Sequence, residues 1–142
     1  MKRQSAGFSI LFLVPLLFAP TCTPAPIQIA EAFGTCSGVE RGETFFDESF
    51  TFTLPPGFRV ILSSTPEGDG AFTIDDGMRL TTNLGVFEHD FSDGCQPLES
   101  LSPQDITDLL ATGDNLLRVE FFDICGTCES NPDLWLTFVP QE

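Results

Sequence analysis

Four acidic side chains between residues 67 and 76 are the best candidates for chemistry in this sequence. They are Glu67, Asp69, Asp75 and Asp76, in the stretch TPEGDGAFTIDDG. Carboxylate oxygens suit Ca²⁺, which takes about six to eight oxygen ligands, although the regular spacing of an EF-hand loop is absent. The simpler interpretation, which we favour, is a turn whose Asp side chains bond to neighbouring backbone N–H groups. Calcium binding at these four residues is the alternative.

Catalysis by these or other acids is not expected. Asp75 and Asp76 are neighbours in a tight turn and point apart, whereas paired carboxylates in an enzyme face each other across a substrate. His89, the single histidine, is flanked by Glu88 and Asp90. In a strand those two acids share one face and His89 points to the other. The sequence therefore predicts a protein that is not an enzyme, has no catalytic residues and requires no cofactor, with calcium as the one candidate ion.

Cysteine usage is typical of export. Cys36, Cys95, Cys125 and Cys128 form an even set, which in a small exported domain favours disulfides, with three alternative pairings. We favour Cys36 with Cys128 and Cys95 with Cys125, because a sandwich could bring those chain ends together. The C-x-x-C of Cys125 and Cys128 follows a strand and does not lead into a helix, so we prefer structural disulfides to zinc or redox chemistry.

The N-terminus has the pattern of a secretory signal peptide. Lys2 and Arg3 precede the apolar run at residues 10–19, which is about half as long as a membrane span. The best cleavage site is the A-x-A that ends at Ala32. This predicts a signal peptide over residues 1–32, a single domain over residues 33–142, and no membrane span after cleavage.

Cys22 offers a rival form of processing, in which a lipid is attached to the cysteine after the apolar run. The residues before it are FAPT, which differ from the Leu-Ala-Gly type of sequence that such a signal resembles. We therefore expect a secreted or cell-surface protein, with a lipid anchor at Cys22 as the lesser alternative.

The charge balance excludes one class of partner. The chain has 6 basic and 21 acidic residues and a formal net charge of −15. Nucleic-acid binding needs clusters of Lys and Arg, so no nucleic-acid partner is expected. Solubility in a salty or extracellular medium explains the acidity more simply than divalent-cation binding does.

Short strand-like runs fill the region from residue 48 onwards and predict an all-β, antiparallel, jelly-roll-like β-sandwich. Asp-Gly at residues 76–77 predicts a hairpin between the runs on either side of it. The expected strands are residues 48–54, 58–63, 71–74, 78–82, 86–91, 115–124 and 134–139.

One short helix is expected over residues 102–113. Ser102 can cap it, Pro103 suits its first position, and Asp105 suits its first turn. Apolar residues at helical spacing follow, and Gly113 ends it. Such a helix would cover an edge or an end of the core.

The aromatic residues argue against a simple sugar-binding platform. The chain has 15 Phe, a single Trp and no Tyr, whereas rings that combine an apolar body with a polar tip suit polar ligands best. Trp135 is either a core residue, which we favour, or a lone stacking surface for a ligand.

Two stretches resemble a known family. DDGMRLTTN (residues 75–83) and LLATGDNLLRVEFFD (residues 109–123) are similar in order and separation to segments of galactose-binding-like jelly-roll domains. In this chain Gly85 comes one place later than the family's Asn-Gly turn. The resemblance implies a jelly-roll β-sandwich, a fold often attached to or acting on extracellular glycans, and it carries over no ligand.

These observations favour an exported, non-catalytic binding module that recognises a glycan or a protein at or outside the cell surface. The alternative is a structural cell-envelope protein whose acidic loops are stiffened by calcium. A small secreted hydrolase ranks last, because no catalytic constellation accompanies His89.

Overall fold

Antiparallel strands are the main secondary structure of the computed structural model, which describes residues 22–35, 42–74, 77–89, 99–123, 126 and 129–142. No helix in these residues is long and apolar enough to cross a membrane. The strands are β1 (Ile27–Ala30), β2 (Phe33–Thr35), β3 (Thr44–Leu54), β4 (Phe58–Ser63), β5 (Phe72–Ile74), β6 (Gly77–Thr81), β7 (Val86–His89), β8 (Glu99–Leu101), β9 (Gln104–Asp105), β10 (Gly113–Phe122), β11 (Glu129–Asn131) and β12 (Leu134–Pro140), with the 3-10 helix η1 (Thr107–Leu109) between β9 and β10.

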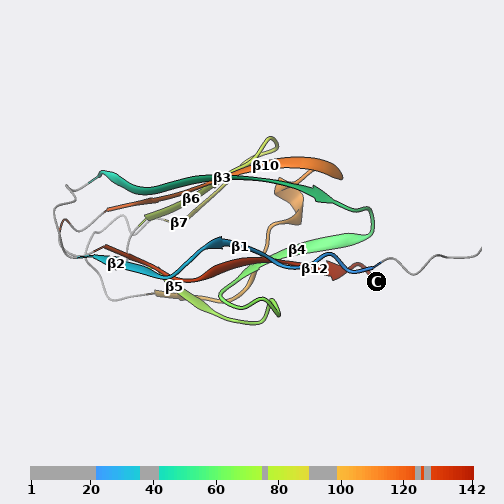
Figure 1. Cartoon of the computed structure of the whole chain (residues 1–142), viewed down its shortest axis with the longest axis horizontal. Helices are drawn as coiled ribbons and strands as arrows, with labels where there is room; N and C mark the ends of the chain where they lie inside the picture. The colour runs from blue at the N-terminus through green and yellow to red at the C-terminus, as the bar shows by residue number, and fades with distance from the viewer. Residues whose placement is uncertain (1–21, 36–41, 75–76, 90–98, 124–125, 127–128) are drawn as a thin grey trace, which may run out of the picture.

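Two four-stranded sheets form the two layers of a sandwich (Figure 1). Their strand orders are β1-β12-β4-β9 and β3-β10-β6-β7, and the smaller pairs β5-β8 and β11-β2 complete the described strands. Counted along the chain, the first of the eight strands pairs with the last, the second with the seventh, the third with the sixth and the fourth with the fifth. This is the order of a jelly roll, so the predicted all-β, antiparallel, jelly-roll-like fold is confirmed.

The core lies between the two sheets and follows the alternation seen in the sequence. Every second residue of the long strands points inward, because side chains alternate across a strand. The predicted runs at residues 58–63 and 134–139 are therefore confirmed as strands, and the run predicted at 115–124 is confirmed as far as Phe122. Their fully or almost fully buried side chains are Val60 and Leu62 of β4, Leu117, Val119 and Phe121 of β10, and Leu134, Leu136 and Phe138 of β12.

The hairpin predicted across Asp-Gly at residues 76–77 is wrong. β5 pairs with β8, whereas β6 pairs with β10 and β7, so the chain changes sheets between β5 and β6. Gly77 is the first residue of β6 and lies beside its register partner Phe122. A Cβ on Gly77 would come within 2.0 Å of the Phe122 ring. This glycine therefore makes room for a ring, and no positive φ is needed there.

The predicted helix over residues 102–113 is reduced to a single 3-10 turn. The backbone of β9 is used to pair with β4, so the helix cannot begin at Ser102. The N-cap residue of η1 is Ile106, which makes no side-chain cap hydrogen bond. Just before it, Asp105 Oδ1 accepts hydrogen bonds from the Thr107 backbone N–H (3.0 Å) and hydroxyl (2.5 Å). Gly113 has a φ of 99° and begins β10.

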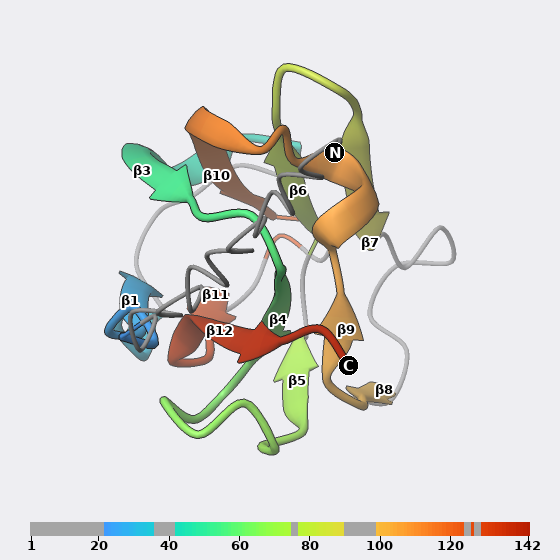
Figure 2. The ribbon, with the colours of Figure 1, turned by 90° about the vertical axis from the view of Figure 1, so that its right-hand side faces the viewer.

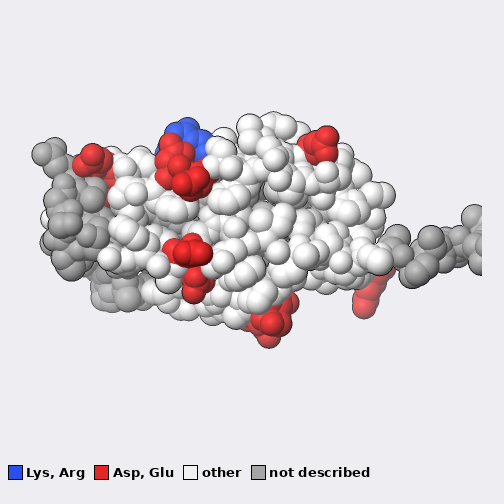
Figure 3. Space-filling view, viewed as in Figure 1, with Lys and Arg blue, Asp and Glu red and all other residues white. Residues whose placement is uncertain are grey.

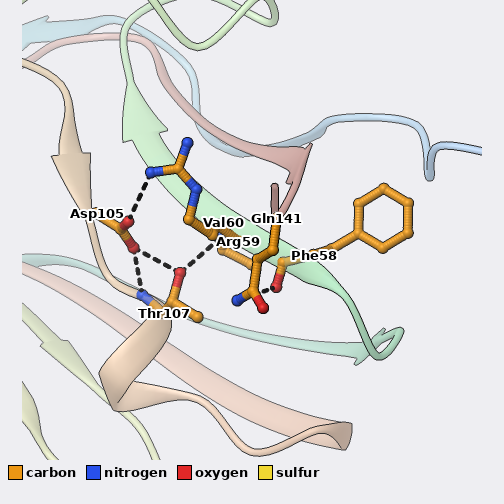
Figure 4. A network of polar contacts seen from close by, with 6 residues as sticks. All are labelled: Phe58, Arg59, Val60, Asp105, Thr107 and Gln141. Carbon is orange, nitrogen blue, oxygen red and sulfur yellow. Dashed lines mark hydrogen bonds and ion pairs between the residues drawn. The ribbon is translucent and has the colours of Figure 1, made fainter.

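The turn η1 lies at an edge of the core, as expected for the helix, and joins the two sheets there. On one side Ile106 N–H donates to the Val60 carbonyl (3.0 Å) and the Thr107 hydroxyl accepts from the Val60 N–H (2.9 Å), as Figure 4 shows for Thr107. On the other side the Thr82 hydroxyl, between β6 and β7, donates to the Leu109 carbonyl (2.5 Å). In Figure 2, η1 lies between β7 and β9, while β1 and β3 lie at the opposite side of the molecule.

β1 precedes the predicted domain start at residue 33 and is nevertheless part of the sandwich. It pairs with β12, and its Ile29 and Ala30 side chains are only 1% and 4% exposed. Cleavage after Ala32 would remove this first strand of the jelly roll. The described sandwich begins at Ile27, whereas the cleavage site itself stays a prediction.

Candidate binding site

A groove of about 420 Å³ opens along the side of the sandwich where β1 and β3 are the outermost strands of their sheets. Residues 28–33 form one wall, and Phe46, Glu48 and Phe50 of β3 form the other. We call it the edge groove. The opposite side of the sandwich is the one that η1 closes, so the two sides of the molecule differ (Figure 2).

The lining of the edge groove is largely apolar. Ile29 is buried, and Phe46 and Phe50 are half-buried against the core. Phe33 leaves 47% of its surface exposed. Its ring stacks on Phe45 with centroids 6.2 Å apart. An exposed ring beside half-buried rings is an apolar surface that another molecule could cover.

Glu48 interrupts this apolar wall at a register position that faces inward. It pairs with Val119 of β10, whose side chain is fully buried. Its neighbours on the same face, Phe46 and Phe50, also face inward, yet Glu48 itself is exposed. A buried, unpaired carboxylate would cost free energy. Glu48 avoids this cost because the edge of the sandwich is open to water there. The groove thus offers a carboxylate between two phenyl rings.

The opposite wall is held by side chains at the end of β11 and in the short segment that follows it. Asn131 Nδ2 donates to the Glu31 carbonyl (2.8 Å). Asp133 Oδ1 accepts from the Ala32 N–H (2.9 Å) and from Gln28 Nε2 (3.2 Å). These contacts fix the backbone of the groove wall before any ligand arrives. The exposed Glu31 side chain adds a second carboxylate to the lining.

The charges along this side of the molecule are mostly negative. In Figure 3, several acidic groups and one basic group stand on an otherwise uncharged surface. Arg118 donates to both oxygens of Asp47, from Nε (2.8 Å) and Nη2 (2.7 Å), on the outer face of the sheet. The Arg118 hydrogen bond holds the pKa of Asp47 below its usual range. Among the described residues, Glu31 and Glu48 have no such ion pair.

A second hollow, of about 510 Å³, lies over the outer face of β3 and β10. Thr53 donates to Asp114 there (2.8 Å), and Leu116 is 48% exposed. This hollow has fewer apolar side chains than the edge groove and is not bordered by facing edges of the two sheets. We therefore take the edge groove as the stronger candidate site.

The predicted calcium ligands are only partly described. Glu67 and Asp69 lie in the loop after β4, where Asp69 Oδ1 accepts from the Thr65 hydroxyl (2.8 Å). Asp75 and Asp76 lie outside the described residues. In the part of the chain that the structure describes, no three candidate metal ligands come together. The four-residue calcium site stays a prediction.

The predicted disulfides also stay predictions, because Cys36, Cys95, Cys125 and Cys128 lie outside the described residues. Cys22 is described, is exposed and precedes β1.

Trp135 is half-buried and is not a core residue, so the favoured interpretation is wrong. It lies on the outer face of β12, where Gln28 and Ser63 are its register partners. Leu134 and Leu136, on either side of it, take the inward positions of the strand. Ligand stacking on Trp135 stays a prediction.

The arrangement around His89 agrees with the expectation that it faces away from its acidic neighbour. Glu88 is exposed and accepts from Arg79 Nε (2.5 Å), whereas His89 is half-buried and pairs in register with Met78. Asp90 lies outside the described residues.

No known protein family matches this chain, and no curated protein matches it. The sequence does not reveal the edge groove, because residues 28–32 are assigned there to the leader and the first expected strand begins at Glu48. Extending the alternation back to Phe46 would have placed Glu48 within an inward-facing apolar row.

Proposed function

We propose that this protein is a non-catalytic binding module, acting at or outside the cell surface, that recognises a protein ligand through the edge groove. The observation that carries the proposal is the apolar groove between two outermost strands. Exposed apolar patches mark interaction sites, and unpaired strand edges provide main-chain hydrogen bonds for an extended segment.

A protein ligand suits this groove better than a glycan does. The aromatic side chains in the lining are Phe33, Phe46 and Phe50, which have no polar tip to bond a sugar hydroxyl. Trp135, the single Trp of the chain, lies on the outer face of β12. The experiment below therefore also tests whether the ligand is a glycan instead.

The relationship to galactose-binding-like jelly rolls is part of the same proposal. Its support is that the two resembling stretches supply β6 and β10, which pair side by side with Arg118 opposite Thr81. The ligand of this chain is argued from its own groove, because binding loops differ widely on one fold.

The test compares the wild-type protein with Phe33→Ala and with the matched control Leu84→Ala, whose exposed leucine lies in the turn between β6 and β7. Each immobilised protein is exposed to extracellular material, and the bound fraction is treated with protease or glycosidase. We expect retention that is abolished by protease, strongly reduced by Phe33→Ala and unchanged by Leu84→Ala. Equal retention by Phe33→Ala and wild type, or binding removed by glycosidase alone, would contradict the proposal.

A further inference from the structure

We infer that the edge groove takes an extended, basic segment of the partner, which adds as a new strand beside β3. This inference rests on the proposed protein ligand and narrows its chemistry. Three features of the edge carry it, namely the edge of β3 that no other described strand pairs with, the shape of the groove, and the two carboxylates in its lining that have no ion pair among the described residues.

The backbone of β3 is open along its outer edge. The strand has 11 residues, about 36 Å at the usual rise per residue, and among the described strands it pairs only with β10. Proteins usually guard such an edge with Lys, Pro, bulges, short strands or an inward-pointing charge. β3 contains no Lys or Pro, and its one irregularity lies near its start, opposite Phe121 and Phe122. Its inward-pointing charge is Glu48, which disfavours a purely apolar strand but not one that brings a basic side chain to it. The edge can therefore accept another strand.

The groove beside this edge selects the side chains of that strand. Alternate residues of an added strand would point inward, over Phe46 and Phe50 and towards Ile29 of the facing wall. Apolar side chains fit these contacts. The Glu48 carboxylate between the two rings, and Glu31 on the facing wall, would pair with Lys or Arg, because a charge-assisted hydrogen bond is favourable where a lone carboxylate is not.

Charge also excludes a second copy of this chain as the occupant. Each copy has a formal net charge of −15. Pairing β3 with β3 would also bring two sets of Asp47 and Glu48 together. Like charges across an interface cost free energy, whereas a basic partner is attracted over a distance and binds faster. The occupant is therefore a basic segment of another protein.

The test uses labelled ten-residue peptides and the full exported protein, with binding followed by fluorescence anisotropy. The basic probe is Ser-Val-Ser-Val-Ser-Lys-Ser-Val-Ser-Val, whose inward row is apolar apart from one Lys that can meet Glu48. The other probes are the same peptide with Glu in place of Lys, and two copies of the basic peptide that are N-methylated on one or the other alternate set of residues. We expect the basic peptide to bind and the acidic one not to bind. One N-methylated peptide should lose binding and the other keep it, since a strand bonds its neighbour through every second residue. Binding that both N-methylations leave intact, or equal binding of the acidic peptide, would overturn the inference.

A matched pair of variants locates the charge. Glu48→Gln should weaken binding of the basic peptide by roughly three- to fivefold, as expected for the loss of one charged pair. Glu67→Gln makes the same chemical change in the exposed loop after β4 and should alter binding by less than about twofold. Equal effects of the two variants would mean that the peptide is attracted by the overall negative charge, and would overturn the assignment of the basic side chain to Glu48.

The two proposals fail in different ways. If the basic peptide does not bind but retention of the natural ligand still depends on Phe33, the edge groove binds protein and the basic-strand chemistry is wrong. If retention is independent of Phe33, the proposed function itself is wrong.

Discussion

At the scale of single residues, Asp105 anchors the edge that η1 closes. One of its oxygens accepts two hydrogen bonds from Thr107, and the other lies 3.4 Å from Arg59 Nη1 (Figure 4). Partial burial acts to raise the pKa of Asp105, but the Thr107 hydrogen bonds and the Arg59 charge outweigh it and hold the pKa below its ordinary value of 3.8. The carboxylate form is thus favoured in the folded protein.

This arrangement predicts a pH-dependent difference between wild type and Asp105→Asn. A carboxyl whose folded pKa is depressed stabilises the fold above its unfolded pKa, and that contribution is lost as pH falls through the folded pKa. We expect Asp105→Asn to be less stable by about 0.5–1 kcal/mol at pH 6, because the half-exposed carboxylate is screened by water, with the difference shrinking below about pH 4. Urea unfolding from pH 6 to pH 3 measures it, with Asp108→Asn in the same turn as control. A difference that is constant with pH would contradict this account.

At the scale of elements, β1 decides whether the sandwich is complete. It supplies the first strand of the jelly roll and one wall of the edge groove. We expect a chain beginning at Thr23 to fold, and a chain beginning at Phe33 to lose about 3 kcal/mol or more through the exposure of buried apolar surface. Thermal unfolding of the two chains tests this, and sequencing the N-terminus of the exported protein shows which one exists. Equal stability would mean that β1 is dispensable.

The short pair β2-β11 bears on the disulfide prediction. One end of this pair is the register pair Thr35 with Glu129. In the sequence, Cys36 directly follows Thr35 and Cys128 directly precedes Glu129. Opposed residues in an antiparallel pair have Cα atoms about 4.5–5.5 Å apart, within the range of a disulfide. We expect no free thiol in a Cys36→Ser, Cys128→Ser protein and two in a Cys36→Ser, Cys125→Ser protein, both in a Cys22→Ser background. Thiol titration after unfolding gives the count, and the reverse result would exclude this pairing.

Elements also show where prediction from the sequence succeeds and where it fails. Short strand-like runs report directly where strands lie, so β4, β10 and β12 fall on runs that the sequence predicts as strands. Alternation does not report which strand pairs with which, so Asp-Gly at residues 76–77 was taken for a hairpin where the chain changes sheets. Predicting the edge groove would have required the strand pairing, because one wall comes from residues assigned to the leader and the other from β3.

At the scale of the whole molecule, a formal net charge of −15 opposes folding. A compact chain holds like charges closer together than an unfolded one does. Arg59, Arg79 and Arg118 each already lie beside a carboxylate, so little basic charge is left among the described residues to offset the remaining acids. Dissolved salt screens this repulsion over about 10 Å at 0.1 M.

Screening predicts that raising NaCl from about 20 to 500 mM increases the melting temperature by about 2–5 °C. Calcium should add nothing beyond NaCl of equal ionic strength if the acids at residues 67–76 only form turns, since an ion bound to the folded state alone must stabilise it further. Calorimetry in matched salt series separates the two effects. An extra rise with millimolar calcium that Asp75→Asn with Asp76→Asn abolishes would establish a calcium site there and favour the calcium-stiffened structural protein. If calcium raises the melting temperature only as much as NaCl of equal ionic strength does, no ion is bound at these acids. The acidic residues then serve to keep the protein soluble and to attract a basic partner.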